Sequence, residues 1–142
     1  METLCTRVER VARDAPARLA LIDGERRIDY AGFWRQARRF AARLRDGGLQ
    51  SGDRVALILP NRIEAAVACY GVWLAGGVVV PLNVQARVRD FLPWLRHCGA
   101  RHVVYEAAHR DAAEAIAQLP SAPECTVLED GRSPPDDESG DP

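Results

Sequence analysis

The sequence contains no lysine, and all 19 of its basic residues are arginines. A chain without lysine has no amine for Schiff-base chemistry, and it cannot supply the lysine of a Walker-type phosphate loop. The motifs GxGxxG, GxxxxGK(S/T), GxSxG and HExxH are also absent. This chain therefore lacks the usual sequence signatures of dinucleotide binding, phosphate-loop binding, serine hydrolysis and zinc-dependent proteolysis.

The four cysteines, at positions 5, 69, 98 and 125, show no CxxC spacing, which favours reduced and mostly buried thiols in a cytoplasmic protein. Charges within the first ten residues argue against a secretory signal peptide. Residues 65–82 form an uncharged run close to the length of a membrane span, but Gly71, Gly76, Gly77 and Pro81 interrupt it. We therefore predict a cytoplasmic chain with no membrane span.

The net charge of −1 hides an uneven distribution. Residues 124–142 hold seven acidic residues against one arginine, a net charge of −6, so residues 1–123 carry +5. A basic body could bind an anionic ligand or nucleic acid. Arginines spread over several helix faces usually serve only to keep a surface solvated, so nucleic-acid binding is the less favoured interpretation.

The most ordered pattern lies between Asp53 and Asn83. The apolar run Val55–Leu59 ends at Pro60, a helical pattern follows as far as Gly76 and Gly77, and a second β-branched run leads to Leu82. Two buried parallel strands joined by a helix produce this pattern. At the start of that helix, Asn61 and Glu64 have the spacing of a capping box. The residues Ile63, Val67, Tyr70 and Leu74 are predicted as its buried stripe.

The flanking segments extend this unit on both sides. We predict a helix over residues 4–15, a hairpin from Leu19–Ile22 and Arg26–Ile28, and a helix capped by Asp29 that ends at Gly47 and Gly48. After Asn83, we predict a helix over Val88–Cys98, a strand over Val103–Tyr105, a helix over Ala108–Leu119 and a strand over Thr126–Leu128. Pro93 must lie in the first turn of its helix or kink it.

The alternation of strands and helices predicts an α/β fold, a mostly parallel sheet covered by helices with an N-terminal β-hairpin. At 142 residues, one folded domain is the default, here spanning residues 1–130. Residues 131–142 are rich in Asp, Pro and Ser, and this composition predicts a disordered acidic tail.

Candidate reactive residues are few. His97, Cys98, His102 and His109 could supply soft zinc ligands, but Gly99 breaks the helix between them, and surface histidines are the preferred reading. The four serines lie in loops or in the tail, which does not support a hydrolase triad. Glu64 has no second acid near it in sequence. We therefore expect no catalytic, cofactor-binding or metal-binding residue in this chain.

The order of several short motifs resembles the N-terminal part of the adenylate-forming (AMP-binding) enzymes, acyl-CoA synthetases among them. The motifs are Ile28-Asp29-Tyr30, Gly52-Asp53-Arg54-Val55, Leu59-Pro60-Asn61, and Leu74-Ala75-Gly76-Gly77 through Val80-Pro81-Leu82-Asn83. The similarity covers about residues 8–130. The chain thus looks like an incomplete portion of the large N-terminal domain of that superfamily.

This resemblance implies ATP-dependent activation of a carboxylate to an acyl-adenylate, usually followed by transfer to coenzyme A. ATP, Mg and coenzyme A are implied for the complete enzyme only. In the family, a Ser/Thr/Gly-rich loop ending in lysine and a C-terminal domain with a further lysine carry that chemistry. Since neither lysine is present, we expect no cofactor binding and no adenylation by this chain alone.

Where many members carry Pro-Arg and then Thr/Ser-Pro-Glu-Glu before a helix, this chain has Val84-Gln85 and then Arg87–Asp90, so the N-cap residue usual in that family is missing here. The departure would suit a truncated or drifting gene. Other interpretations are one half of a split ligase, a non-catalytic module that docks a partner or self-associates through an exposed sheet edge, and a small α/β domain that binds anions or nucleic acid.

Overall fold

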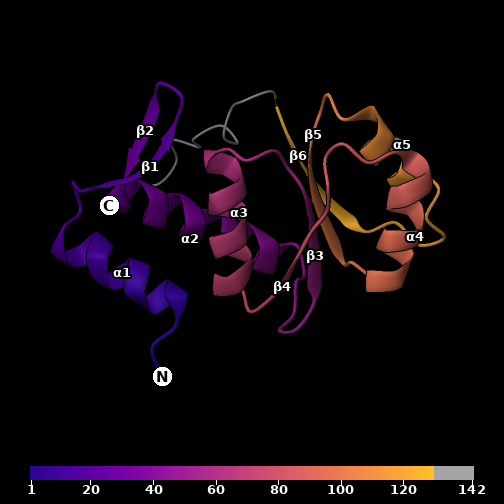
Figure 1. Ribbon diagram of the computed structural model, residues 1–142. Coiled ribbons are helices and arrows are strands. Elements are labelled where there is room, and N and C mark those ends of the chain that lie inside the picture. The colour runs from indigo at the N-terminus through magenta and orange to yellow at the C-terminus, as the bar shows by residue number, and fades with distance from the viewer. Residues whose placement is uncertain (130–142) are drawn as a thin grey trace.

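The computed structural model describes residues 1–129 (Figure 1). Helices and strands alternate along this part of the chain. In order they are α1 (Leu4–Asp14), β1 (Leu19–Asp23), β2 (Arg26–Asp29), α2 (Tyr30–Asp46), β3 (Arg54–Ile58), α3 (Ile63–Leu74), β4 (Val78–Pro81), α4 (Val88–Cys98), β5 (His102–Glu106), α5 (Arg110–Ala117) and β6 (Glu124–Leu128). The predicted α/β class and every predicted element are confirmed. Residues 131–142, predicted as a disordered tail, lie outside the described residues.

Four strands form one parallel sheet in the order β4-β3-β5-β6. The chain leaves β3 for β4 on one side and returns past β3 to β5 on the other side. β1 and β2 form a separate antiparallel hairpin, in which Gly24 adopts a φ of 59° at the turn. The predicted mostly parallel sheet with an N-terminal hairpin is therefore confirmed.

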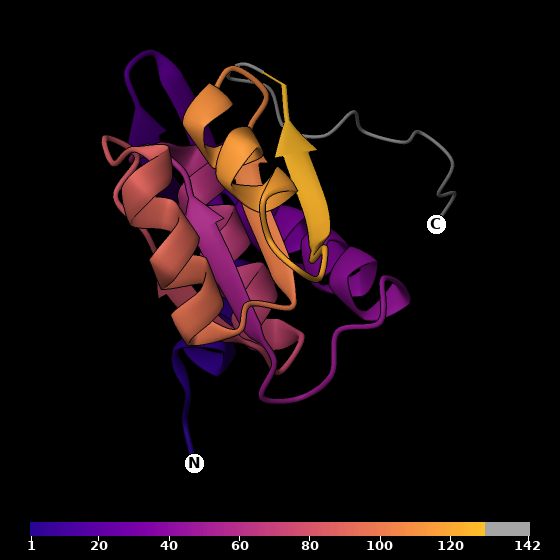
Figure 2. The ribbon, with the colours of Figure 1, turned by 90° about the vertical axis from the view of Figure 1, so that its right-hand side faces the viewer.

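Helices cover both faces of the sheet (Figure 2). On one face, Val55 and Leu57 of β3 pack in a cluster with Phe40 and Leu44 of α2 and with residues of α3. On the other face, Ala56 and Ile58 pack with Phe91 of α4 and with residues of α5. Because successive strand residues point to opposite faces, β3 is buried on both sides and reads as a continuous apolar run.

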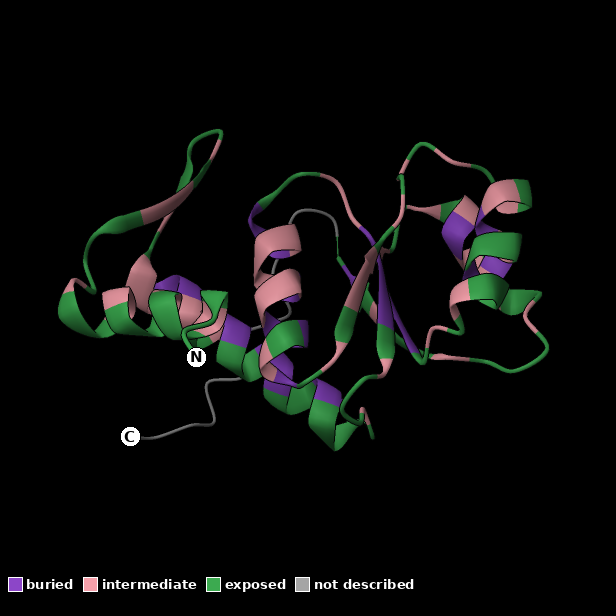
Figure 3. Cartoon of the chain, turned by 60° about the horizontal axis from the view of Figure 1, so that its bottom comes forward, coloured by how far each residue is buried: buried purple, intermediate pink, exposed green. Residues whose placement is uncertain are grey.

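Helix α1 lies outside these layers, and none of its residues is buried (Figure 3). Its apolar residues Val8, Val11 and Ala12 are only partly covered. Their spacing makes a single stripe, which is sufficient to hold one side of the helix against α2. Within residues 1–129, no helix combines the length and apolar character needed to cross a membrane.

The cap predicted for α2 is confirmed, and the capping box predicted for α3 is wrong. The Asp29 carboxylate accepts a hydrogen bond from the Gly32 amide at 2.7 Å. The N-cap of α3 is Arg62, without a side-chain cap. Glu64 does not reach back to Asn61, because its carboxylate binds Arg26 of the hairpin instead. A charged partner forms a stronger hydrogen bond than a backbone amide does.

The buried stripe of α3 also differs from the prediction. Ile63 is buried as expected, but Val67, Tyr70 and Leu74 are only partly buried. The other buried residues of the helix are Glu64, Ala68, Gly71 and Val72. The difference arises because α3 packs against the sheet on one side and closely against α2 on another, so two faces are covered at once.

Helix α4 begins at Val88, although the chain lacks the Thr/Ser N-cap that the resemblance led us to expect before it. The Asp90 carboxylate accepts a hydrogen bond from the Arg87 amide at 3.0 Å and so satisfies one donor at the helix start. Pro93 lies beyond the first turn, where its ring nitrogen cannot donate to the carbonyl four residues before it. Gly99 ends the helix with a φ of 59°, as predicted.

Candidate functional site

The strand order makes the carboxyl edge of the sheet the best position for a ligand. β3 lies between β4 and β5, and α3 and α4 lie on opposite faces. The connections that leave β3 and β4 therefore run in opposite directions along the sheet. In open α/β sheets, ligands bind in the crevice at such a point, outside the carboxyl ends of the strands. In this chain, the loops that follow β3, β4 and β5 surround that position.

An ion pair joins the ends of the two central strands. Arg62, which follows β3, lies 3.5 Å from a carboxylate oxygen of Glu106 at the end of β5. The Glu106 side chain is 22% exposed and that of Arg62 is 44% exposed. Water screens such a pair, so its contribution to stability is small. It neutralises the one carboxylate that β5 carries to this edge.

A hollow of about 510 Å³ lies between the loop after β4 and the start of α5. Arg87 and Arg110 line it, together with His109 and Asp111. One guanidinium nitrogen of Arg87 lies 3.8 Å from Asp111. Two exposed arginines at a concave surface favour an anionic group, but the hollow contains no nucleophile paired with a base.

His109 holds the walls of this hollow together. Its Nδ1 accepts a hydrogen bond from the Ala112 amide at 3.2 Å, and its Nε2 lies 2.7 Å from the Val84 carbonyl oxygen. Since Nδ1 accepts, the proton is on Nε2, which donates to Val84. The ring also contacts Phe91 edge-on at 5.4 Å. Both ring nitrogens form hydrogen bonds within the protein, so His109 holds the loop after β4 against the start of α5.

His102 is buried, which corrects the prediction that the histidines lie on the surface. It is 7% exposed and its Nε2 lies 2.8 Å from the Thr126 hydroxyl. Burial lowers the pKa of His102, an effect that the nearby Glu124 partly opposes. The four candidate zinc ligands are not brought together, and within residues 1–129 no three His, Cys, Asp or Glu side chains converge on one point.

Lowering the pH is expected to destabilise the fold through His102. Its pKa in the folded chain lies below the ordinary value, so the unfolded chain binds the proton more tightly. The stability contributed by neutral His102 is complete above the unfolded pKa of about 6.5 and is lost as the pH falls toward the folded pKa. One such proton changes the free energy of unfolding by at most about 1.4 kcal/mol per pH unit.

Urea denaturation between pH 7.5 and pH 5 measures this effect. The pH slope should be smaller in His102→Gln than in the parent chain. Since His97 is exposed, His97→Gln is the matched control and should leave the slope unchanged. Equal slopes in the parent chain and in His102→Gln would refute the assignment.

Glu64 belongs to a second polar cluster, and a partner acid missed by the sequence lies close to it. Arg26 donates from Nη2 to one Glu64 oxygen at 2.5 Å and from Nη1 to the other at 3.2 Å. Asp23 accepts from the same Nη1 at 3.4 Å and from the Ile63 amide at 3.3 Å. The hydrogen bond to Glu64 raises the pKa of Arg26 above its usual value, and the Glu64 and Asp23 charges add to this. With both acids bound by arginine, the cluster fastens the hairpin to α3.

The four cysteines are all unpaired by disulfides. Cys125 is exposed, contrary to the expectation of mostly buried thiols, while the other three are partly buried. Burial raises the pKa of the Cys5, Cys69 and Cys125 thiols, and neighbouring Glu124 adds to the effect at Cys125. Thiols with a raised pKa are poor nucleophiles at neutral pH.

Solved structures with this fold include acid–CoA ligases. A benzoate CoA ligase from Burkholderia xenovorans LB400 superposes with a TM-score of 0.81 at 25% identity, over 91% of this chain and 26% of its own. The N-terminal domain of FACL13 from Mycobacterium tuberculosis superposes with a TM-score of 0.80 at 27% identity, over 89% of this chain and 34% of its own.

Curated relatives are similar in sequence. The chain is 31% identical over 91 residues to 2-succinylbenzoate–CoA ligase from Bacillus licheniformis, covering 64% of this chain and 19% of the relative. It is 30% identical over 117 residues to medium/long-chain-fatty-acid–CoA/3-oxocholest-4-en-26-oate–CoA ligase from Mycobacterium marinum. That match covers 82% of this chain and 21% of the relative. The chain thus spans about a fifth of the length of these relatives.

Residues 8–141 match the AMP-binding enzyme family, and the chain belongs to that family. The resemblance drawn from the sequence motifs is therefore confirmed. The motifs that carry the resemblance form the scaffold: the Leu59-Pro60-Asn61 segment follows β3, and Gly76 and Gly77 lead from α3 into β4. Gly76 adopts a φ of 86°, a conformation that favours glycine.

Proposed function

We propose that this chain forms the N-terminal scaffold of an ATP-dependent acyl-CoA synthetase, which activates a carboxylate as an acyl-adenylate before transfer to coenzyme A. The observation that carries the proposal is the family match over residues 8–141. The ligases similar in sequence and in fold support the same reaction class. The scaffold would place its carboxyl edge beside the residues that perform the chemistry.

We infer that these 142 residues do not perform the reaction by themselves and contain no catalytic residue. Transfer at phosphorus requires cations close to the oxygens on which charge develops. The arginines Arg62 and Arg87 at the carboxyl edge are already engaged with Glu106 and Asp111. Lysine, which the family uses twice, is absent from the sequence.

The residues at the carboxyl edge do not make a fitting site for Mg²⁺. This ion is held by one or two carboxylates together with substrate phosphates. Glu106 and Asp111 are the acids there, and each has an arginine as partner. A carboxylate paired with arginine must lose that partner before it can hold a cation. ATP, Mg²⁺ and coenzyme A are therefore assigned to the complete enzyme only.

Pyrophosphate release tests this proposal. The purified 142-residue chain, given ATP, Mg²⁺ and a panel of aliphatic and aromatic carboxylates, is expected to release no more pyrophosphate than a reaction without carboxylate. The benzoate CoA ligase from Burkholderia xenovorans, assayed with benzoate, serves as the positive control. Carboxylate-dependent release by this chain alone would overturn the inference of inactivity.

A second candidate function is a non-catalytic interaction module, or one half of a split ligase. The observation favouring it is the pair of outer strands: Val78 of β4 is 46% exposed and Val127 of β6 is 45% exposed. Unpaired edge strands with apolar side chains are suited to pairing with another chain or a second copy.

Three observations separate the split ligase, the interaction module and the anion-binding domain. A neighbouring reading frame that encodes a Ser/Thr/Gly-rich loop ending in lysine supports the split ligase. Monomeric behaviour in sedimentation, with no such neighbour, argues for a module that docks a different protein. Steeply salt-dependent binding to nucleic acid would instead favour the anion-binding reading.

A further inference from the structure

A positively charged groove lies between α1 and α2, away from the carboxyl edge of the sheet. It forms a hollow of about 640 Å³. Its walls include Arg13 of α1 and Arg35, Arg38 and Arg39 of α2, and Trp34 of α2 also lines it. Glu9 is the acidic residue in the lining, and Arg13 is paired with Asp14, so the positive charge of the groove comes chiefly from α2.

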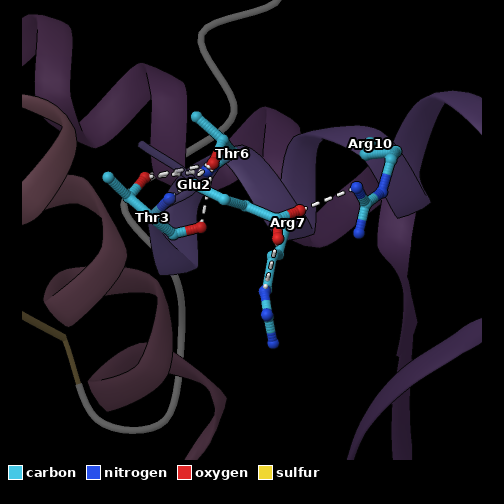
Figure 4. Close-up of polar contacts among 5 residues, drawn as sticks. All are labelled: Glu2, Thr3, Thr6, Arg7 and Arg10. Atoms are coloured by element: carbon cyan, nitrogen blue, oxygen red, sulfur yellow. Dashed lines mark hydrogen bonds and ion pairs between the residues drawn. The ribbon is translucent and has the colours of Figure 1, made fainter.

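The arginines on α1 already have acidic partners. Glu2 accepts from Arg7 at 3.2 Å and pairs with Arg10 at 2.7 Å, at the same turn where the Thr3 and Thr6 hydroxyls cap the helix (Figure 4). Arg13 lies 3.2 Å from Asp14. Most of the charge of this helix is therefore compensated locally.

Helix α2 differs, because its sequence has no acidic residue before Asp46 at its last position. Arg35 and Arg38 are exposed, and neither forms an ion pair with another residue of the described range 1–129. Like charges one helical turn apart repel each other, which destabilises the helix slightly. A negatively charged segment in the groove would remove that repulsion.

We propose that the acidic segment 129–141 of this same chain docks in the groove between α1 and α2. The segment holds Glu129, Asp130, Asp136, Asp137, Glu138 and Asp141 against the single base Arg132, a net charge of −5. Its charge is thus opposite in sign to that of the groove. Trp34 adds a flat apolar wall, and the neighbouring prolines Pro134 and Pro135 are residues that aromatic-lined grooves accept.

The segment begins close enough to reach the groove. Leu128, directly before it, is buried in the same cluster as Phe40, Ala41 and Leu44 on the inner side of α2. Thirteen extended residues span at most about 45 Å. Helix α2 has 17 residues and is therefore about 26 Å long and 10–12 Å thick. A segment that starts on one side of α2 can thus reach the arginines on its other side.

Attachment to the same chain makes weak contacts effective. A tether of this length keeps the acidic residues at an effective concentration on the order of millimolar beside the groove. Two exposed ion pairs, Arg35 and Arg38 with acids of the segment, together favour the docked state about fivefold. A docked segment would cover the arginines of the groove and compete there with other anions.

NMR of the 15N-labelled 142-residue chain tests the proposal. Replacing three acids together, Asp136→Asn, Asp137→Asn and Glu138→Gln, should shift the indole N–H signal of Trp34 and the α2 amides near Arg35. The indole signals of Trp73 and Trp94, on α3 and α4, are internal controls and should not move. Sodium chloride at about 0.5 M should produce the same shift at Trp34, since salt screens exposed ion pairs.

Trypsin cleavage after Arg132 gives a second measurement. Release of peptide 133–142 should be about fivefold faster in the double variant Arg35→Gln/Arg38→Gln than in the parent chain. Arg89→Gln/Arg96→Gln removes the same charge from exposed positions on α4 and should leave the rate unchanged. Equal acceleration by both double variants, or a Trp34 signal unmoved by the three acid replacements, would overturn the proposal. The Trp34 measurement tests the proposal by itself even if Arg35→Gln/Arg38→Gln does not fold.

Discussion

Replacing Arg26 with methionine is expected to lower the free energy of unfolding by about 2–3 kcal/mol. Glu64 is 9% exposed, and Arg26 is the cation that binds both of its carboxylate oxygens. Loss of one partner from a buried pair costs about 3–5 kcal/mol, because a charge stays buried without compensation. The Arg26 side chain is 41% exposed, so water screens part of the interaction and the estimate is reduced accordingly.

Urea denaturation of the single and double variants measures this loss. Arg27→Met, at the neighbouring exposed position of β2, is the matched control and should change stability by no more than about 0.5 kcal/mol. Arg26→Met/Glu64→Gln should be more stable than Arg26→Met, since Glu64 then no longer holds a buried charge without its cation, while Asp23 keeps the hydrogen bond from the Ile63 amide in both variants. If Arg26→Met is as stable as Arg27→Met, the pair does not hold the hairpin to α3.

Gly71→Ala is expected to destabilise the chain by about 2 kcal/mol, although alanine is the better helix former. A Cβ at this position would lie 2.5 Å from Cδ1 of Phe40 and 3.1 Å from the Ala37 carbonyl oxygen. Phe40 and Ala37 are both buried on α2, so neither can move freely. The glycine is therefore required by the close approach of α2 and α3.

The same denaturation measurement with a second substitution tests the cause. Phe40→Ala removes the Cδ1 atom that the new methyl group would meet, so Gly71→Ala should cost less in the Phe40→Ala background than in the parent chain. Gly24→Ala is a control for backbone strain alone, because a Cβ there would meet nothing within 4 Å. A gain of about 1 kcal/mol from Gly71→Ala, as helix propensity alone predicts, would contradict this account.

The order and type of the elements could be predicted because local patterns encode them. The apolar run Val55–Leu59 and the helical spacing that follows it appear in the structure as β3 and α3. Asp29, Gly47 and Gly99 end or begin their helices as their residue types suggest. Each of these features depends on residues within one or two turns of each other, which a single sequence displays directly.

The predictions that failed involve partners distant in the sequence. Glu64 is three residues from Asn61, so local rules favour a capping box, but Arg26 approaches from 38 residues away and binds it. His102 was predicted to lie on the surface, but in the structure it is hydrogen-bonded to Thr126 of the neighbouring strand β6. The ion pair of Arg62 with Glu106 depends in the same way on β5 lying next to β3.

The groove between α1 and α2 also depends on contacts between residues that are distant in the sequence. The sequence displays a basic body and an acidic segment, but it does not state which arginines share a surface. Arg13 and Arg38 line one hollow only because α1 packs along α2.

The sequence by itself determined the family, the series of strands and helices, and the absence of lysine chemistry. Each of these is a property of residue identity and short-range spacing. The tertiary structure decided which side chains meet: Arg26 with Glu64, Gly71 with Phe40, and Arg62 with Glu106. These contacts follow from the order in which strands pair and helices pack, which depends on the burial of apolar faces over the whole chain.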